Sequence, residues 1–205
     1  MTFDSVDELH KIKAISPEAE VVLRIVTDDS ESTCQLSNKF GAYLCDVNQL
    51  LDTVNELGLD CIGTSFHVGS GGSDVNAFAE PLEHAAWVFE QAKSKGIDMN
   101  LLDIGGGFPG DDSGPVTFEQ IAKQVNPVLD NLFPESVKVI AEPGRFFSQS
   151  CGSLVTKVIN RRFVTEQAKK DAGAEADAPD VYYYIGDGTY GSFDCKTADH
   201  YIPEE

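Results

Sequence analysis

The chain has 205 residues, of which 41% are hydrophobic and 24% charged, as in an ordinary globular protein, and its formal net charge is −19. Nucleic acids and anionic membranes bind cationic surfaces, so this charge argues against both as partners. The 5 cysteines form no CxxC pair, the first residues show no signal-peptide pattern, and no apolar run reaches ~18–20 residues, so we expect a cytoplasmic protein without a disulfide framework, a metal site or a membrane span.

Short apolar runs alternate with amphipathic stretches over the first 141 residues. β-Branched content and length predict strands at residues 21–26, 61–66, 100–104 and 137–141. Apolar residues at helical spacing predict helices at residues 5–14, 47–57, 75–95 and 118–132. Ser5 is the expected N-cap of the first helix, and Pro127 is expected to perturb the last one. Such alternation forms a parallel sheet, either in a barrel or in a doubly wound fold, and four units are too few to close an eight-stranded barrel.

The pattern changes near residue 154. Residues 154–164 and 181–185 read as strands, and the polar insert between them, residues 165–180, is predicted to be a hairpin loop. Helix signals are absent here, so we expect a second, all-β domain to begin. Two or three strands are too few for a free-standing sheet, and this part is therefore expected to be incomplete.

A glycine-rich segment, residues 65–72, follows the second predicted strand. Loops of this kind let backbone N–H groups approach an anion such as phosphate. Ser70 adds a hydroxyl donor, and the His67 imidazole could stack on a planar ring or transfer protons. A flexible loop with a surface histidine explains this motif equally well when it is taken alone.

Three successive glycines, Gly105, Gly106 and Gly107, end the third predicted strand. They cost conformational entropy and have no evident packing use, whereas close approach of the backbone to a ligand would offset that cost. A plain tight turn needs only one or two glycines, so phosphate binding is the favoured interpretation.

An acid and a guanidinium stand at the end of the fourth predicted strand, which its composition predicts to be buried. Pro143 and Gly144 separate Glu142 from Arg145 and are expected to turn the chain sharply. Glu142 can pair with a protonated ring nitrogen, as an acidic residue does for pyridoxal phosphate, and Arg145 can bind a phosphate or hold Glu142 ionised. A salt-bridged structural turn is the alternative for this stretch alone.

Arg24 lies within the first predicted strand and needs a partner there. It could orient a cofactor substituent, although a structural ion pair is the commoner case. Because the carboxyl ends of parallel strands meet at one edge of a sheet, the three loops described above are expected to converge on one pocket.

These residues resemble a known family, the fold-type III, alanine-racemase-like pyridoxal phosphate decarboxylases, and within it the eukaryotic ornithine decarboxylases. The similarity runs from Phe3 to about His200, and six stretches carry it: residues 23–30, 36–42, 65–71, 101–110, 140–146 and 187–193. The resemblance implies an α/β fold, with a partial (β/α)8 TIM-like barrel over residues 1–153 and the start of an all-β C-terminal domain over residues 154–205.

The resemblance also implies a role for each matching residue. His67 would stack on the ring of pyridoxal 5'-phosphate and serve as a catalytic residue. Ser70 and Gly107 would bind the phosphate, with Gly105 and Gly106 beside them. Glu142 would pair with the ring nitrogen, and the following turn, Pro143, Gly144 and Arg145, would complete the phosphate site.

Three further positions match residues of the family. Arg24 would lie near the ring hydroxyl, and Asp199 would bind the distal amino group of the substrate across a homodimer interface to which Lys39 belongs. The family usually has an aromatic residue before that acid, where this chain has Ala198.

The implied activity is decarboxylation of L-ornithine to putrescine in polyamine biosynthesis, with antizyme as a further partner. The alternatives are a non-catalytic homologue like the antizyme inhibitors, and a decarboxylase for arginine or lysine. The family's lysine that bonds the cofactor, its Cys-Asp loop and its C-terminal tyrosine have no counterpart here. We therefore expect a central fragment that holds the cofactor but does not turn over substrate.

Overall fold

A parallel sheet organises the first part of the chain. The computed structural model describes residues 1–171, 173 and 178–195, and the chain divides into two units, Met1–Cys151 and Gly152–Glu205. In the described part of the first unit, five strands pair in the order of the sequence, and every pair is parallel. They are β1 (Thr2–Phe3), β2 (Glu20–Arg24), β3 (Asp60–Ser65), β4 (Leu101–Asp103) and β5 (Lys138–Ile140).

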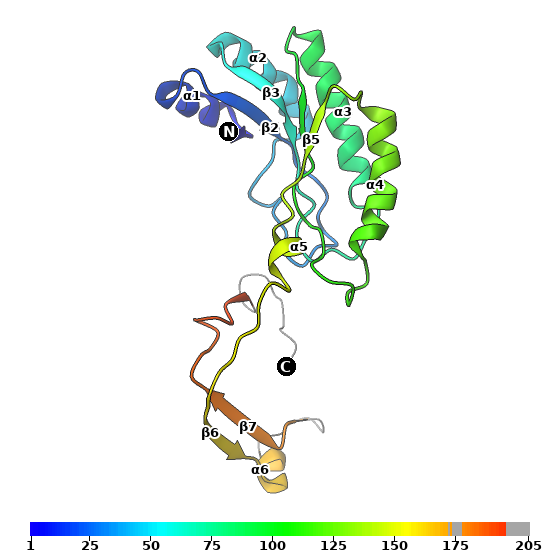
Figure 1. Ribbon diagram of the computed structural model, residues 1–205. Coiled ribbons are helices and arrows are strands. Elements are labelled where there is room, and N and C mark those ends of the chain that lie inside the picture. Colours follow the sequence, from blue (N-terminus) through cyan, green and yellow to red (C-terminus); the bar gives the residue numbers. More distant parts are fainter. Residues whose placement is uncertain (172, 174–177, 196–205) are drawn as a thin grey trace. The chain divides into compact units, whose positions relative to one another are not determined.

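A helix connects each strand to the next one (Figure 1). The connecting helices are α1 (Val6–Ile15), α2 (Val47–Leu57, after the short 3-10 helix η1, Leu44–Asp46), α3 (Ala79–Ser94) and α4 (Phe118–Leu132). Connections between parallel strands are almost always right-handed, so sequential strand order places all four helices on one face of the sheet. Each helix accordingly contacts its successor. This is the arrangement of a βα barrel, not of a doubly wound sheet, and the predicted α/β partial barrel is confirmed.

The helix-covered face of the sheet forms the main core. Leu23, Thr64 and Leu102 are register partners on β2, β3 and β4, and all three are fully buried. The Thr64 hydroxyl donates to the Leu23 carbonyl oxygen at 2.7 Å, which satisfies the only polar side chain of this row. Since side chains alternate along a strand, the residue after each of these points to the other, helix-free face.

An aromatic cluster joins the core to the loops at the carboxyl ends of the strands. The ring of Phe78 lies 6.4 Å from that of Phe66 and 5.0 Å from that of Phe108, measured between centroids, and Phe108 contacts Phe118 at 5.7 Å. These residues come from the loop after β3, the start of α3, the loop after β4 and the start of α4. Their packing fixes the loops that follow β3 and β4 relative to each other.

Local capping explains most helix ends. The Ser5 side chain accepts a hydrogen bond from the Glu8 N–H at 3.4 Å, as predicted. Helix α4 begins with a capping box between Thr117 and Gln120 and continues through Pro127. Helix α3 begins at Ala79, four residues later than predicted, because residues 75–78 form a turn instead.

The prediction for the last strand of the sheet is wrong in one respect. β5 is an edge strand and is largely exposed, with Val139 at 40%, because no further strand or helix covers it in this unit. The chain also does not simply turn after it. Gly144 begins a short helix, α5 (Gly144–Ser148), with Pro143 as its N-cap residue.

The second unit contains an antiparallel hairpin. β6 (Val158–Phe163) pairs with β7 (Val181–Ile185), so the predicted small antiparallel sheet at the C-terminal end is confirmed. The insert between them is not only loop, because α6 (Glu166–Asp171) lies within it. Lys169 on this helix contacts both Glu166 and Asp180, which supplies local stabilisation that hydrophobic periodicity does not reveal.

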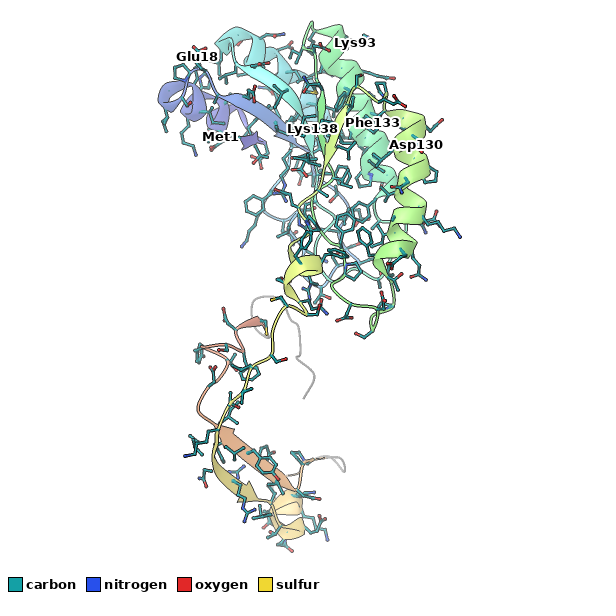
Figure 2. The ribbon with its side chains drawn as sticks, viewed as in Figure 1. Met1, Glu18, Lys93, Asp130, Phe133 and Lys138 are labelled. Carbon is teal, nitrogen blue, oxygen red and sulfur yellow. The ribbon has the colours of Figure 1, made fainter. Side chains whose placement is uncertain are left out.

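The amino ends of the strands lie at the opposite end of the sheet from the glycine-rich loops. Glu18, Lys93 and Lys138 mark that end in Figure 2, before β2, at the end of α3 and at the start of β5. Among the described residues, no helix combines the length and the apolar character needed to cross a lipid bilayer.

Candidate functional site

Three loops meet at the carboxyl ends of β3, β4 and β5. We call residues 66–72 the β3 loop, residues 104–110 the β4 loop and residues 141–145 the β5 turn. A Cβ placed on Gly106 of the β4 loop would lie 2.7 Å from His67 Nε2 and 2.8 Å from the Glu142 carbonyl oxygen. The Glu142 N–H also donates to the Gly105 carbonyl oxygen at 2.7 Å. The expected convergence of these loops is therefore present in the structure.

The other two glycines of the β4 loop are required by contacts with the β3 loop. Gly105 and Gly107 have φ values of +63° and +105°, which side chains rarely adopt. A Cβ on Gly105 would lie 2.1 Å from the Phe66 carbonyl oxygen, and one on Gly107 would lie 2.6 Å from the Gly69 carbonyl oxygen. The expectation that these glycines have no packing use is wrong, because they let two backbone segments approach within the site.

A cation and a hydroxyl face each other across the site. Arg145 Nε donates to Ser70 Oγ at 3.1 Å, which joins the β5 turn to the β3 loop over 75 residues of sequence. Arg145 is half-buried at the second residue of α5, whereas Glu142 and Gly144 are exposed. A guanidinium beside a hydroxyl is a donor set suited to a phosphate group.

The His67 imidazole is held in one neutral form. Burial and the nearby Arg24 guanidinium lower the pKa of His67 to about 4, although Asp29 opposes the shift. The Gly69 N–H donates to His67 Nδ1 at 3.0 Å, so the ring proton resides on Nε2. An uncharged, oriented ring can lie against a planar ligand without adding a positive charge to it.

Asp103 is a buried carboxyl group at the end of β4 that sequence reasoning did not select as a site residue. Its side chain is 7% exposed, and its Oδ1 accepts a hydrogen bond from the Gly105 N–H at 2.9 Å. Burial raises the pKa of Asp103, and the Glu142 carboxylate acts in the same direction, whereas Arg24 opposes it. Asp103 thus shapes the β4 loop directly, and a carboxylate in an apolar strand just before three glycines was the available signal.

Arg24 ends β2 beside these groups. It is half-buried, and its guanidinium carbon lies 5.1 Å from the centroid of the Phe40 ring, a cation–π contact. Its influence on the pKa values of His67 and Asp103 places it within electrostatic reach of both. The structure therefore brings Arg24 to the same edge of the sheet as the three loops.

A segment after β2, residues 27–37, runs along the β3 loop, and we call it the strap. Three hydroxyl groups of the strap donate hydrogen bonds to carbonyl oxygens of the β3 loop. The bonds are Thr27 to His67 (2.9 Å), Ser32 to Val68 (2.7 Å) and Thr33 to Gly71 (3.1 Å).

The strap is also fixed by backbone pairing and by its own buried acid. Cys34 and Ser70 exchange two backbone hydrogen bonds, of 3.0 and 3.1 Å. Asp29 is 7% exposed, and its Oδ2 accepts from the N–H groups of Leu36 and Ser37 at 2.5 and 2.9 Å. The run of Thr, Asp and Ser in this segment hinted at such bonding, but its partners lie about 40 residues away.

The remaining expected site residues lie elsewhere. Asp199 is outside the described residues. Lys39 is exposed just beyond the strap, where its N–H donates to the Leu36 carbonyl oxygen at 3.0 Å. The other lysines of unit Met1–Cys151 lie on helices, next to the end of α3 or at the amino end of β5: Lys11, Lys13, Lys93, Lys95, Lys123 and Lys138.

Comparison with known proteins agrees with this geometry. Residues 1–149 match the family model described as pyridoxal-dependent decarboxylase, pyridoxal binding domain. Antizyme inhibitor 2 of Xenopus laevis is 47% identical over 206 residues, which cover 100% of this chain and 45% of that protein. Ornithine decarboxylase of Mus musculus is 46% identical over 203 residues, covering 98% of this chain and 44% of that protein.

A solved structure shows the same similarity in three dimensions. The arginine decarboxylase of Paramecium bursaria Chlorella virus, bound to agmatine, superposes with a TM-score of 0.86 at 33% identity, over 99% of this chain and 52% of that one. The chain thus spans about half the length of the proteins it matches. With the family model matching most of its length and the loops converging as described, the chain belongs to the pyridoxal-dependent decarboxylases, whose cofactor is pyridoxal phosphate.

Proposed function

We propose that this chain is the cofactor-binding part of a pyridoxal phosphate-dependent decarboxylase that acts on a basic amino acid, most specifically L-ornithine. The observation that carries the proposal is the meeting of three loops at Gly106, where His67, Glu142 and the Ser70–Arg145 pair come together. Each of these groups suits a different part of pyridoxal phosphate.

The donor set fits the cofactor at its phosphate and at its ring nitrogen. Arg145 and Ser70 supply a charge-assisted donor and a hydroxyl to the phosphate. The exposed Glu142 carboxylate is available to accept a hydrogen bond from a protonated ring nitrogen. By doing so Glu142 would keep that nitrogen protonated, and the neutral His67 ring would lie on the ring face without opposing its charge.

Bound pyridoxal phosphate supplies an electron sink for the pair of electrons left on the α-carbon when carbon dioxide departs. The described residues contribute binding and orientation, since the strap and the aromatic cluster hold the β3 and β4 loops in place. Covalent attachment of the cofactor needs a lysine, and the lysines of unit Met1–Cys151 lie away from the loops that meet at Gly106. We therefore propose that residues 1–205 bind the cofactor without covalent attachment and do not turn over substrate alone.

The finer features of the proposal follow from the resemblance and from the names of the relatives. The product would be putrescine, made in the cytoplasm as part of polyamine biosynthesis. Asp199 would bind the distal amino group of L-ornithine across a homodimer interface that includes Lys39, and antizyme would be a regulatory partner. Ornithine decarboxylase and antizyme inhibitor 2 among the relatives support these assignments.

Titration of the purified chain with pyridoxal phosphate, followed by calorimetry, tests the binding site. Arg145→Met and Glu142→Gln should each weaken binding about 10- to 100-fold, because each removes a hydrogen bond to a charged group. Lys95→Met, at the other end of the sheet, is the matched control and should leave the dissociation constant unchanged. Equal affinity in all four proteins would refute the proposed site.

A substrate panel tests the reaction. The chain, extended by the flanking segments that its relatives carry, should release carbon dioxide from L-ornithine faster than from L-arginine or L-lysine. A second function remains open, because antizyme inhibitor 2 and ornithine decarboxylase match almost equally well, at 47% and 46% identity. If the extended protein binds pyridoxal phosphate and antizyme but releases no carbon dioxide from any of the three, the non-catalytic alternative is correct.

A further inference from the structure

A row of polar side chains crosses the helix-free face of the sheet at its carboxyl edge. Arg24 pairs in register with Ser65, and Ser65 pairs with Asp103, so the three occupy neighbouring positions on β2, β3 and β4. Register partners in a parallel sheet point to the same face, and this row follows directly after the fully buried, helix-facing row that contains Thr64. The strands thus direct an apolar row to the helices and a polar row away from them.

The hydroxyl of Ser65 is unusual within this row. Ser65 is 4% exposed, and its Oγ has no hydrogen-bond partner among the residues that the structure describes. A buried hydroxyl without a partner costs roughly 1–3 kcal/mol, so native proteins retain few of them. The hydroxyl of the adjacent Thr64, which points to the other face, is fully satisfied by the Leu23 carbonyl oxygen.

The polar row lies between the groups that surround the candidate cofactor site. Arg24 lowers the pKa of His67, and Glu142 raises that of Asp103, so electrostatic interactions link the row to both sides of the site. His67 follows Ser65 by two residues, and Phe66 between them points into the aromatic cluster. Ser65 is thereby placed under the space that His67 and Glu142 flank.

We propose that Ser65 Oγ donates a hydrogen bond to the ring oxygen of bound pyridoxal phosphate, with Arg24 beside it as a second donor. This inference rests on the proposed function. The cofactor carries a phosphate, a ring nitrogen, a carbonyl group and a ring oxygen. The first two are matched by the Ser70–Arg145 pair and by Glu142, and the carbonyl group must stay free to react with an amine.

The chemistry of the row matches that oxygen. A hydroxyl on an electron-poor pyridinium ring is readily deprotonated, and the resulting oxygen anion needs donors. Arg24 is a permanent donor, and the unpartnered Ser65 hydroxyl can rotate to become another. Bonding would satisfy Ser65 only in the ligand-bound protein, which explains why a buried hydroxyl without a partner is retained.

Binding of two ligands to three proteins tests the inference. The ligands are pyridoxal phosphate and its 3-deoxy analogue, which lacks the ring oxygen, and the proteins are the wild type, Ser65→Ala and Thr64→Val. Ser65→Ala should bind pyridoxal phosphate about 10- to 100-fold more weakly than the wild type, as for a lost bond to a charged group. The same variant should bind the 3-deoxy analogue as well as the wild type does.

Stability of the ligand-free proteins supplies the second measurement. Ser65→Ala should melt at the same temperature as the wild type or higher, because it removes an unsatisfied group. Thr64→Val, the matched control on the opposite face, should melt at a lower temperature because it breaks a buried hydrogen bond, yet it should bind both ligands as the wild type does.

The outcomes separate this inference from the proposed function. Equal binding of pyridoxal phosphate by the wild type and Ser65→Ala, or an equal loss for both ligands, would show that Ser65 does not contact the ring oxygen, while the cofactor site stands. If the wild type bound neither ligand, the proposed function would be wrong and the inference with it.

Discussion

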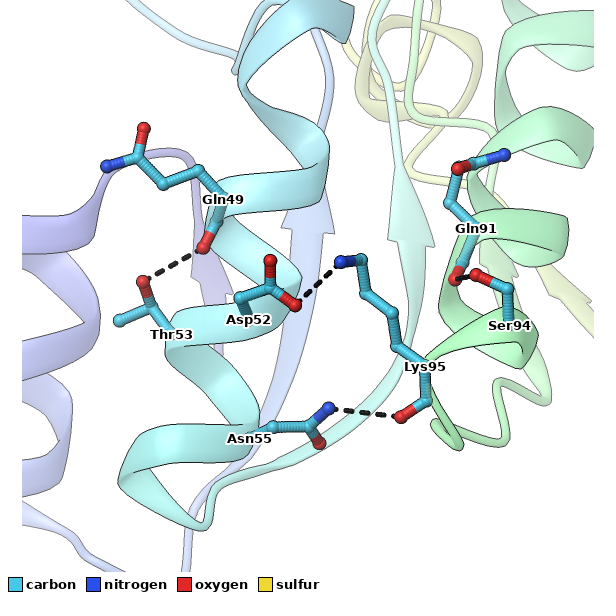
Figure 3. Close-up of polar contacts among 7 residues, drawn as sticks. All are labelled: Gln49, Asp52, Thr53, Asn55, Gln91, Ser94 and Lys95. Carbon is cyan, nitrogen blue, oxygen red and sulfur yellow. Dashed lines mark hydrogen bonds and ion pairs between the residues drawn. The ribbon is translucent and has the colours of Figure 1, made fainter.

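The two ends of the parallel sheet are built in different ways. At the amino end, α2 and α3 are joined by exposed polar contacts, in which Lys95 Nζ lies 2.6 Å from Asp52 Oδ1 and Asn55 Nδ2 donates to the Lys95 carbonyl oxygen at 3.1 Å (Figure 3). At the carboxyl end, polar groups such as Asp29 and Asp103 are buried and bonded to loop backbone. In βα barrels the carboxyl end carries the active site and the amino end contributes stability.

Glycines show the difference most clearly. Gly58 and Gly96 follow α2 and α3 with φ values of +59° and +78°, and an added Cβ would meet nothing within 4 Å. Gly105 and Gly107 also have positive φ, but a Cβ on either would lie within 3 Å of another backbone segment. The same residue type serves backbone conformation alone at one end, and both conformation and close approach at the other.

Gly105→Ala should have the largest effect of a single substitution. The alanine would pay the cost of a positive φ and would collide with the Phe66 carbonyl oxygen, which together destabilise by about 2–5 kcal/mol. Displacement of the β3 loop should also abolish binding of pyridoxal phosphate. Chemical denaturation measures the first effect and ligand titration the second.

Gly58→Ala is the control for that prediction. Its φ is also positive, so we expect a loss of about 1–2 kcal/mol, but with open space around the new methyl group the affinity for pyridoxal phosphate should not change. Equal losses of stability and affinity in the two variants would contradict the contrast between the ends of the sheet.

His67 should make stability depend on pH at the carboxyl end. Its pKa is lowered from 6.5 in the unfolded chain to about 4 in the folded one, so between these values the unfolded state binds more protons. Stability should therefore rise with pH across this window and be lost as pH falls from about 6.5 through about 4. The shift corresponds to at most about 3 kcal/mol, and to less because part of the ring contacts solvent.

Denaturation of the wild type and His67→Gln at a series of pH values measures this effect. The variant lacks the group, so the difference in unfolding free energy between the two proteins should vary between pH 4 and 6.5 and be constant above it. A difference that does not change with pH would show that His67 titrates normally.

Hydrophobic periodicity was sufficient to predict the four main strands and their connecting helices. The glycine clusters and the Glu142–Arg145 stretch were recognised for a similar reason, since their chemistry is carried by consecutive residues. The exposure of β5 could not be predicted, because an apolar β-branched run looks the same at an edge and in the middle of a sheet. Helix α6 was missed because its residues are polar all round.

The parts of the site that sequence reasoning missed depend on register and on distant pairing. Ser65 and Asp103 gain meaning only when β3 and β4 pair and place them side by side. The strap hydroxyls bond carbonyl groups some 36 to 40 residues away, which no local pattern specifies. Sequence motifs thus identified the groups suited to touch a cofactor, but not the residues that hold those groups in place.

The strap provides a smaller test at the carboxyl end. Ser32→Ala removes the hydrogen bond to the Val68 carbonyl oxygen and should cost about 1 kcal/mol of stability. Because Val68 lies between His67 and Ser70, binding of pyridoxal phosphate should also weaken, by about 2- to 10-fold. Ser32→Thr, which keeps the hydroxyl, should restore affinity; an affinity unchanged by Ser32→Ala would mean that the loop is held without the strap.

The smallest effect is expected at the amino end, where Lys95→Met breaks the contact with Asp52. The Asp52 side chain is 57% exposed, so the pair gains little Coulomb energy, and its loss should cost about 0.2–1 kcal/mol. The loss should shrink further at high salt, because exposed charges are screened. Met retains most of the packing of the lysine stem, so a larger, salt-independent loss would indicate that this contact is more than a surface ion pair. A change in affinity for pyridoxal phosphate would be more serious, because it would show that the two ends of the sheet are coupled.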